Sequence, residues 1–321
     1  MADIINRIGI YGDLHLFSEN YGGHRDYSKE SLIYLRRITE LTSELGLTHL
    51  IGLGDFSFGN FRKLTYRKAV EAELAKQFDY VKGNRWELFG NHDFLPKDIS
   101  ERDYYIGKGL LKPSENITVG KMHITMVDNG KVESTPVNIE EGAVNIILAH
   151  DYFKFNGINL PNYGDAYILD ELENWYGADY LICGHIHKCM SFSGSIIKDD
   201  KAHKMIVDYP GCAMRPAFIK GHMDDKVHLV VFTEYSDGRV EVSTSEIELL
   251  PLSESFNLEK IEKKYQKEEE KAQSVDISDM VYNLDTHERV VGTPEVIINN
   301  MQGIPDVWKN KAISLLKDAV S

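Results

Sequence analysis

Residues 86–95 read WELFGNHDFL: a short apolar run ends at a glycine and continues directly into Asn91, His92 and Asp93. A short apolar run that is bounded by turn residues is typical of a buried strand. Gly90 lets the backbone turn tightly at the end of the strand, so the polar side chains after it can point into one space. The stretch therefore predicts a core strand that carries chemically active groups at its carboxyl end.

Four other stretches have the same form, in which an apolar run is followed by glycine or polar residues. They are RIGIYGD at 7–13, THLIGLGD at 48–55, VNIILAHD at 144–151 and ADYLICGHIH at 178–187. Helical patterns at 27–46, 61–78 and 165–178 lie between these predicted strands, and Gly46 is suited to end the first helix. Strands that alternate with helices indicate an α/β protein.

Beyond residue 200 the pattern changes to successive strands. KMIVDYPG at 204–211 precedes a predicted hairpin at 228–252, with Asp237 and Gly238 in its turn. From Ser253 a highly charged stretch predicts either a solvated helix or a linker, and an apolar helical pattern returns at 294–320. This closing pattern is too small for a core of its own, so it packs on the main domain or on a partner. We expect a catalytic domain at 1–252 and a helical segment at 253–321.

Composition limits the location and the partners of the protein. The chain has 321 residues, 42% of them hydrophobic, and a formal charge of −14 from 36 basic and 50 acidic residues. The acidic balance argues weakly against a nucleic acid partner, because phosphates favour basic surfaces but bound metal ions are missing from the count. No apolar stretch is long enough to cross a bilayer, and the start of the chain lacks the features of a signal peptide. We expect a cytoplasmic protein without membrane contact.

The polar residues at the ends of the predicted strands form one set. They are Asp13, His15, Asp55, Asn91, His92, Asp93, His150, His185 and His187, which include five of the twelve histidines. Functional groups of α/β proteins gather beyond the carboxyl ends of the strands, so we expect these side chains to lie together. Mixed nitrogen and oxygen ligands suit Mn²⁺, Fe²⁺ or Zn²⁺. The three cysteines show no C-x-x-C pairing, so neither a disulfide framework nor a thiolate zinc site is expected.

The ordered motifs GDLH, GLGD, GNHD, LAHD and GHIH, within residues 8–187, resemble those of the calcineurin-like metallophosphoesterases. The resemblance implies an α/β four-layer sandwich, in which two mixed β-sheets are flanked by helices; a small helical C-terminal appendage follows here. It also implies two divalent metal ions, for which we expect Mn²⁺, with Fe²⁺, Zn²⁺ and Mg²⁺ as alternatives. Carried over motif by motif, the ligands of one ion are Asp13, His15 and His187. Those of the other are Asn91, His150 and His185, and Asp55 bridges the two ions.

The chemistry of such a site assigns further roles. Two metal ions roughly 4 Å apart stabilise the attacking and leaving oxygens of an in-line displacement at phosphorus, and they acidify a bridging water to hydroxide. His92 holds no metal in this scheme and can donate a proton to the departing alkoxide. Asp93 would hold the tautomer of His92 and raise its basicity. We therefore expect His92 and Asp93 to be the catalytic residues of a phosphoesterase that attacks with a metal-bridging hydroxide.

A second resemblance indicates one branch of this family. The segment that starts at GHIH resembles SbcD-type DNA repair nucleases, in which a YPGS-like turn and a downstream arginine follow. Here the turn is YPGC at 209–212, with Cys212 in place of the usual serine, and the arginine is Arg215. Arg215 either approaches a substrate phosphate or forms a surface ion pair. The end of the chain is similar to that of SbcD-like recombination endonuclease subunits of large phages, whose helices dock on an SbcC-type, SMC-like ATPase.

These features predict a DNA nuclease subunit, with exonuclease or endonuclease action, of an SbcCD-like repair or recombination complex in a bacterial or phage-infected cytoplasm. DNA and the ATPase are the expected partners, and a homodimer is a further option. The acidic charge favours an alternative, a small-molecule or nucleotide phosphodiesterase or phosphatase of the same superfamily. A catalytically inactive scaffold is a third hypothesis, but such proteins usually lack a ligand of the set, and here none is missing.

Some other residues have simpler interpretations. Trp86, Phe89 and Trp175 fall in apolar patterns, so we expect them in the core and not as surfaces on which bases stack. His24 and Arg25 follow GDLHLF. They either line the mouth of the site or lie on an exposed loop, and we favour the loop.

Overall fold

A computed structural model describes residues 2–21, 23–94, 99–158, 160, 165–212, 227–274 and 309. The strands are β1 (Ile4–Tyr11), β2 (His49–Gly52), β3 (Arg85–Glu87), β4 (Ile117–Val119), β5 (Met122–Val127), β6 (Val144–Ala149), β7 (Phe153–Lys154), β8 (Tyr167–Ile168), β9 (Tyr180–Cys183), β10 (Met190–Lys198), β11 (Lys201–Tyr209), β12 (Val227–Tyr235) and β13 (Val240–Ile247). The helices are α1 (Tyr27–Glu44), α2 (Leu64–Tyr80), α3 (Glu101–Gly107), α4 (Leu252–Ser255) and α5 (Leu258–Ser274), and the 3₁₀ turns are η1 (Asn91–Asp93), η2 (Leu169–Glu171) and η3 (Glu173–Trp175).

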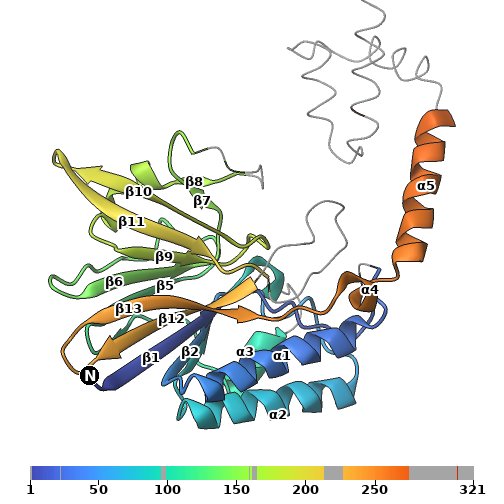
Figure 1. The fold of residues 1–321 in the computed structure, drawn as a ribbon, viewed down its shortest axis with the longest axis horizontal. Coiled ribbons are helices and arrows are strands. Elements are labelled where there is room, and N and C mark those ends of the chain that lie inside the picture. The colour runs from blue at the N-terminus through green and yellow to red at the C-terminus, as the bar shows by residue number, and fades with distance from the viewer. Residues whose placement is uncertain are drawn as a thin grey trace, which may run out of the picture. The chain divides into compact units, whose positions relative to one another are not determined.

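Two mixed β-sheets form the centre of the fold (Figure 1). The first has the order β13-β12-β1-β2-β3, in which β1, β2 and β3 are parallel and β12 and β13 pair antiparallel. The second has the order β10-β11-β9-β6-β5-β4, in which the four inner strands are parallel and the two edge strands antiparallel. This arrangement confirms the predicted α/β fold with two mixed sheets flanked by helices.

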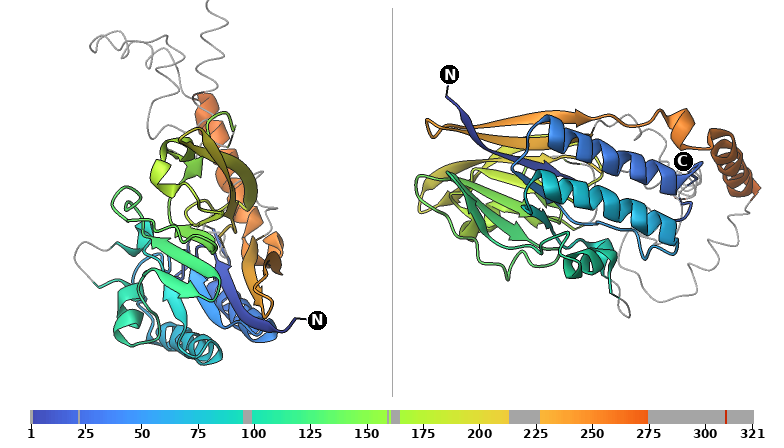
Figure 2. Two further views of the ribbon diagram at one scale, coloured as in Figure 1. Left: turned by 90° about the vertical axis from the view of Figure 1, so that its left-hand side faces the viewer. Right: turned by 90° about the horizontal axis from the view of Figure 1, so that it is seen from below.

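Apolar residues fill the spaces between the layers. A cluster that includes Ile10, Ile51, Ile146 and Leu148 lies between the two sheets. Helices α1 and α2 lie side by side and cover the outer face of the first sheet, where their apolar residues are buried against the strands (Figure 2). The predicted first helix is confirmed as α1, and Gly46, with φ of +59°, follows its end in the left-handed conformation that glycine tolerates.

The outer face of the second sheet is covered differently from the prediction. The spacing at 165–178 predicts a helix, but the described part of this segment forms β8 and the 3₁₀ turns η2 and η3. Strand β8 pairs with β7, and both Leu169 and Trp175 are fully buried against the sheet. Pairing and burial outweigh the local helical preference here, as tertiary contacts often do.

Other local predictions meet the structure in different ways. Strands β12 and β13 form the predicted hairpin, with Gly238 at φ of +81° in the turn. Strands β4, β5 and β10 are absent from the sequence prediction, and they complete the second sheet. His24 is not on an exposed loop: it is 7% exposed, with its Nδ1 2.7 Å from Glu30 Oε2, whereas Arg25 is exposed.

Contacts within the chain divide it into two units, Met1–Phe256 and Asn257–Ser321. Helix α5 starts the second unit and confirms the predicted helix in the charged stretch. The predicted division after residue 252 stays a prediction, as does the docking function of residues 253–321. In the part of the chain that the structure describes, no helix is both long enough and apolar enough to cross a membrane.

Candidate metal centre

The candidate ligands follow strand ends at the carboxyl edges of the two sheets. Parallel strands bring their carboxyl ends to the same edge. In the first sheet, β1 is followed by Asp13 and His15, β2 by Asp55 and β3 by Asn91. In the second sheet, the ends of β6 and β9 carry the remaining three histidines, His150, His185 and His187. The structure brings all seven side chains together.

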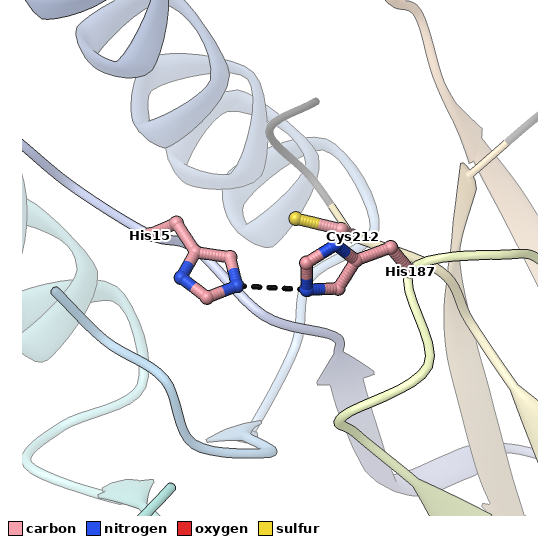
Figure 3. Close-up of side chains that lie close together, drawn as sticks. All are labelled: His15, His187 and Cys212. Carbon is pink, nitrogen blue, oxygen red and sulfur yellow. Dashed lines mark hydrogen bonds between the residues drawn. The ribbon is translucent and has the colours of Figure 1, made fainter. Parts of the chain in front are cut away.

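One group of side chains contains Asp13, His15 and His187. The Nε2 atoms of His15 and His187 face each other at 2.9 Å (Figure 3). Asp13 Oδ2 lies 3.9 Å from His15 Nε2 and 3.6 Å from His187 Nε2. These three residues could therefore hold one cation.

A second group contains Asn91, His150 and His185. The Asn91 side-chain oxygen lies 3.1 Å from His150 Nε2 and 2.9 Å from His185 Nδ1. The other ring nitrogen of His150 lies 2.7 Å from the carbonyl oxygen of Leu53. Because a carbonyl only accepts, His150 Nδ1 carries a hydrogen, and Nε2 is the nitrogen that faces the site.

Asp55 lies between the two groups. Its Oδ2 atom is 3.6 Å from His15 Nε2 in the first group and 3.4 Å from His150 Nε2 in the second. Its other oxygen accepts a hydrogen bond of 2.8 Å from the backbone N–H of His92. One carboxylate thus reaches both groups while the backbone after β3 fixes its orientation.

The backbone is strained at this centre. Six non-glycine residues of the described chain have a positive φ, and three of them are the candidate ligands His15 (47°), Asp55 (49°) and His185 (77°). A positive φ is uncommon outside glycine and costs free energy, so it persists only where the surrounding structure holds it, which is often at a functional site. The strain here coincides with the converging side chains.

Comparison with known protein families identifies the family of the chain. Residues 6–189, more than half of the chain, match the family model of the calcineurin-like phosphoesterases. The chain belongs to this family. No curated protein matches the sequence. Among solved structures, a dimetal phosphatase from Danio rerio is similar, with 15% sequence identity, a TM-score of 0.45, and coverage of 77% of this chain and 100% of that chain.

As a calcineurin-like phosphoesterase, the chain is a metal-dependent hydrolase whose family binds two divalent metal ions. The donor set fits such ions, because Asp13 and Asp55 are buried carboxylates, each 1% exposed, among imidazoles. Among the residues that the structure describes, none forms a hydrogen bond with the buried Nδ1 of His15. In the part of the chain that the structure describes, three groups of side chains lie close enough to share a metal, and each contains His15 or Asp55.

The electrostatics of this phosphoesterase centre follow from burial. Burial, together with the nearby Asp55 carboxylate, raises the pKa of Asp13 to about 7, although His150 opposes the shift. For His150, burial acts to lower the pKa, but Asp13 and Asp55 outweigh it and raise the pKa to about 10. Burial also lowers the pKa of His15 well below its usual range. The centre therefore has a negative potential that favours bound cations while His15 stays neutral, the form that binds metals.

Glycines make the close approach of the loops possible. A Cβ on Gly90 would lie 2.2 Å from both the backbone nitrogen and Oδ1 of Asp55, and a Cβ on Gly184 would lie 2.6 Å from Asp13 Oδ1. Any side chain at either position would displace a candidate ligand. The glycines of GNHD and GHIH thus have a packing function in addition to the turn that the sequence predicts.

His92 lies beside the two groups. It is half-buried, and its ring centroid is 5.1 Å from that of His15. A group formed by His15, Asp55 and His92 is compact enough to hold a metal, so a ligand role for His92 competes with the predicted acid role.

Asp93 has different partners from the predicted ones. It is 1% exposed, and its carboxylate accepts hydrogen bonds from the backbone N–H groups of Gly90, Phe56 and Ser57 at 3.0 to 3.3 Å. The expected hydrogen bond to the His92 side chain is not among its contacts with described residues. Buried N–H groups need acceptors, so Asp93 holds the loops after β2 and β3 instead of orienting His92.

Further sequence predictions concern Arg215, the cysteines and the aromatic residues. Arg215 lies outside the described residues. Cys212 lies next to His15 and His187, although no sequence pattern marks it as a ligand. Trp86 and Trp175 are in the core as predicted, at 4% and 0% exposed. The ring of Phe58 lies beside His92, and that of Tyr21 lies beside Phe58; no periodic pattern could reveal these contacts because both residues lie in irregular loops.

Proposed function

We propose that this calcineurin-like phosphoesterase cleaves phosphodiester bonds of DNA, as the nuclease subunit of an SbcCD-like complex with an SbcC-type ATPase. The order of the motifs, the YPGC turn at 209–212 and the resemblance at the end of the chain support this proposal. The ATPase rests on the sequence resemblance alone, since nearly all of residues 275–321 lie outside the described part of the chain.

The observation that carries the proposal is a group of rings beside the metal centre, in which Phe58 contacts both His15 and His92 and Tyr21 contacts Phe58. The ring centroids of His15 and His92 are 5.1 Å apart, those of His92 and Phe58 are 4.8 Å apart, and those of Phe58 and Tyr21 are 4.5 Å apart. Phe58 is partly exposed, and Tyr21 is 41% exposed. Nucleobases stack on exposed aromatic rings, so a leaving group held at His92 finds a surface for its base next to it.

The side chains of the centre have separate tasks in this reaction. The metals would be held by the two groups described above, with Asp55 between them. Bound there, divalent ions supply Lewis acidity and lower the pKa of water at the reacting phosphorus. His92 is anchored through its backbone N–H on Asp55, so its half-buried ring can give a proton to the oxygen that leaves. Asp93 and Leu53 keep the loop and the His150 tautomer in place.

The native metal belongs to this proposal. Mn²⁺ is the expected ion, and Fe²⁺, Zn²⁺ and Mg²⁺ are alternatives that a nitrogen and oxygen donor set accepts. Activity measured with each ion after removal of bound metal would rank them. Mn²⁺ should give the highest rate on a phosphodiester.

A test of the nuclease function uses two matched DNA substrates. One is a short single strand, and the other has an abasic residue on the leaving side of the cleaved bond. Wild-type protein should cut the first with a kcat/KM higher by roughly 5- to 150-fold, because stacking of a base contributes about 1–3 kcal/mol. Tyr21→Ala should remove this preference, whereas Tyr80→Ala, which changes an equally exposed residue at the end of α2, should not.

The alternative is a phosphatase or phosphodiesterase for small molecules, which the acidic net charge favours. Assays of one enzyme preparation on DNA and on small phosphoesters distinguish the two functions. Rapid hydrolysis of nucleotides or phosphomonoesters, without cleavage of DNA either alone or with a co-expressed candidate ATPase, would contradict the nuclease proposal. Co-elution of a coiled-coil ATPase with the tagged chain, lost on truncation after residue 256, would support the complex.

A further inference from the structure

Cys212 lies beside the first group of candidate ligands. It closes the YPGC turn after β11, and it is 2% exposed (Figure 3). Its sulfur and one ring nitrogen each of His15 and His187 all lie within 4.8 Å of one another. The sequence places Cys212 in the YPGC turn that follows GHIH, but no C-x-x-C spacing marks it as a metal ligand.

The backbone ties Cys212 to the loops that carry both histidines. Its N–H donates a hydrogen bond of 3.1 Å to the carbonyl oxygen of His187, and its sulfur lies 3.4 Å from the carbonyl oxygen of Asp13. The preceding Gly211 touches Gly12, where an added Cβ would lie 2.0 Å from the Gly211 oxygen. The sulfur is therefore held next to the two histidines by contacts on both sides.

The two histidines independently indicate a ligand at this place. Their Nε2 atoms are 2.9 Å apart. Two imidazole nitrogens that bind one ion at about 2.0–2.1 Å lie roughly 3 Å apart, so this spacing suits ligands of a single metal. His15 is fully buried, so the nitrogen that it turns toward His187 is shielded from solvent.

We propose that Cys212 is a sulfur ligand of the ion held by Asp13, His15 and His187. The proposal rests on the metal centre described above and adds a donor to it. On binding, the thiol proton leaves to solvent and the sulfur donates an electron pair to the ion, as cysteine ligands do. Thiolate favours Zn²⁺ and iron, whereas carboxylate and water suit Mn²⁺ and Mg²⁺. The first position is therefore selective for a softer metal than the second, whose donors are nitrogen and oxygen alone.

Packing is the competing explanation for the thiol. Cys212 also belongs to a small buried cluster with Tyr27 and Tyr34. In that case the sulfur only fills space, and a serine of similar size would leave the metal preference unchanged. The two explanations therefore differ in what Cys212→Ser does to the bound metal and not in what it does to the fold.

Cobalt supplies a spectroscopic test that does not depend on activity. The purified chain is stripped of metal and loaded with Co²⁺, and the bound cobalt is measured by elemental analysis. Wild-type protein should show a sulfur-to-cobalt charge-transfer band in the near ultraviolet, and Cys212→Ser should lose the band while it still binds cobalt. Cys189→Ser is the matched control, because Cys189 pairs with His228 and not with the candidate ligands, and it should keep the band.

Competition between zinc and manganese gives a second readout. Loss of a residue that only hydrogen-bonds a metal ligand lowers metal affinity by roughly 10- to 100-fold. Loss of a ligand should have at least this effect, so the ratio of zinc affinity to manganese affinity should fall by at least as much in Cys212→Ser. Bound cobalt without a charge-transfer band in wild-type protein, or a band that survives in Cys212→Ser, would overturn the proposal. Failure of the wild type to bind cobalt would overturn the metal centre itself, whereas loss of DNA cleavage alone affects only the nuclease function.

Discussion

Two clusters of charged residues are buried in this protein, and their charges are compensated in different ways. The first lies in the interior, where Arg85 and Glu87 are both fully buried and Arg85 Nη1 is 3.2 Å from Glu87 Oε2. Tyr11 donates a hydrogen bond of 2.5 Å to Glu87, and Arg85 Nε donates one of 2.8 Å to Gln77. This cluster contains its own counter-charge.

The metal centre has no arginine or lysine as a counter-charge among the described residues, and its carboxylates are balanced only by the His150 imidazole, whose pKa they raise. Asp13 and Asp55 are as deeply buried as Glu87, but their side-chain neighbours are imidazoles and an amide, and no arginine or lysine pairs with them among the described residues. Burying a charge without a partner is costly. The first cluster is therefore structural, whereas the second depends on cations from outside the chain. Substitutions in the two clusters should therefore affect different properties.

Asp55→Asn should have the largest effect on activity. The change removes a charge that lies within reach of both ligand groups, so hydrolysis of a phosphodiester should fall by about four powers of ten or more, equivalent to several kcal/mol. The content of bound metal should fall as well, which elemental analysis measures. Glu87→Gln is the control from the other cluster: it should keep its metal, and a loss of metal in this variant would contradict the distinction.

Arg85→Met should affect stability instead. It leaves Glu87 buried without its counter-charge, so the free energy of unfolding in urea should fall by about 3–5 kcal/mol. The folded fraction should retain its metal content and rate. Arg85→Met combined with Glu87→Leu should recover much of the loss, and a double variant as unstable as the single one would show that the ion pair is not the cause.

His92→Ala separates the acid role from a ligand role. If His92 protonates the leaving oxygen, kcat should fall by about two to four powers of ten while both metals stay bound. A substrate with a good leaving group, such as a p-nitrophenyl ester, needs less protonation and should lose less. Loss of one metal in this variant would instead assign His92 to the ligands, with His15 and Asp55.

His228, which belongs to neither cluster, should make the free energy of unfolding depend on pH. Burial acts to lower its pKa, but hydrogen bonds to Asp208 and Cys189 raise the pKa to about 9. A raised pKa in the folded state means that the stabilisation is complete below the ordinary histidine pKa of about 6.5 and is lost as the pH rises through 9. The free energy of unfolding should fall by up to about 3 kcal/mol over this range. Urea titrations across it should show this slope, and His228→Gln should flatten it.

The sequence anticipates the centre well because each candidate ligand follows an apolar run. Asp13, Asp55 and His150 are found by their position after strands, and parallel strands bring such ends to one edge. The partners of Asp93 depend on how the loops after β2 and β3 approach each other, which no local pattern encodes. The helix predicted at 165–178 is wrong for a similar reason, because the helical spacing competes with strand pairing and burial that involve distant residues.

The amino-acid sequence by itself determines the α/β class and the set of polar residues at the strand ends, since these depend on local periodicity and on the geometry of parallel strands. The two mixed sheets are expected only from the resemblance to the family. Only the tertiary structure decides that the sulfur of Cys212 lies beside His15 and His187, that Phe58 lies beside His92 and that Tyr21 lies beside Phe58. These contacts join loops that are far apart in the chain. Their geometry depends on packing between the layers, which acts on the whole fold and leaves no periodic signal in the sequence.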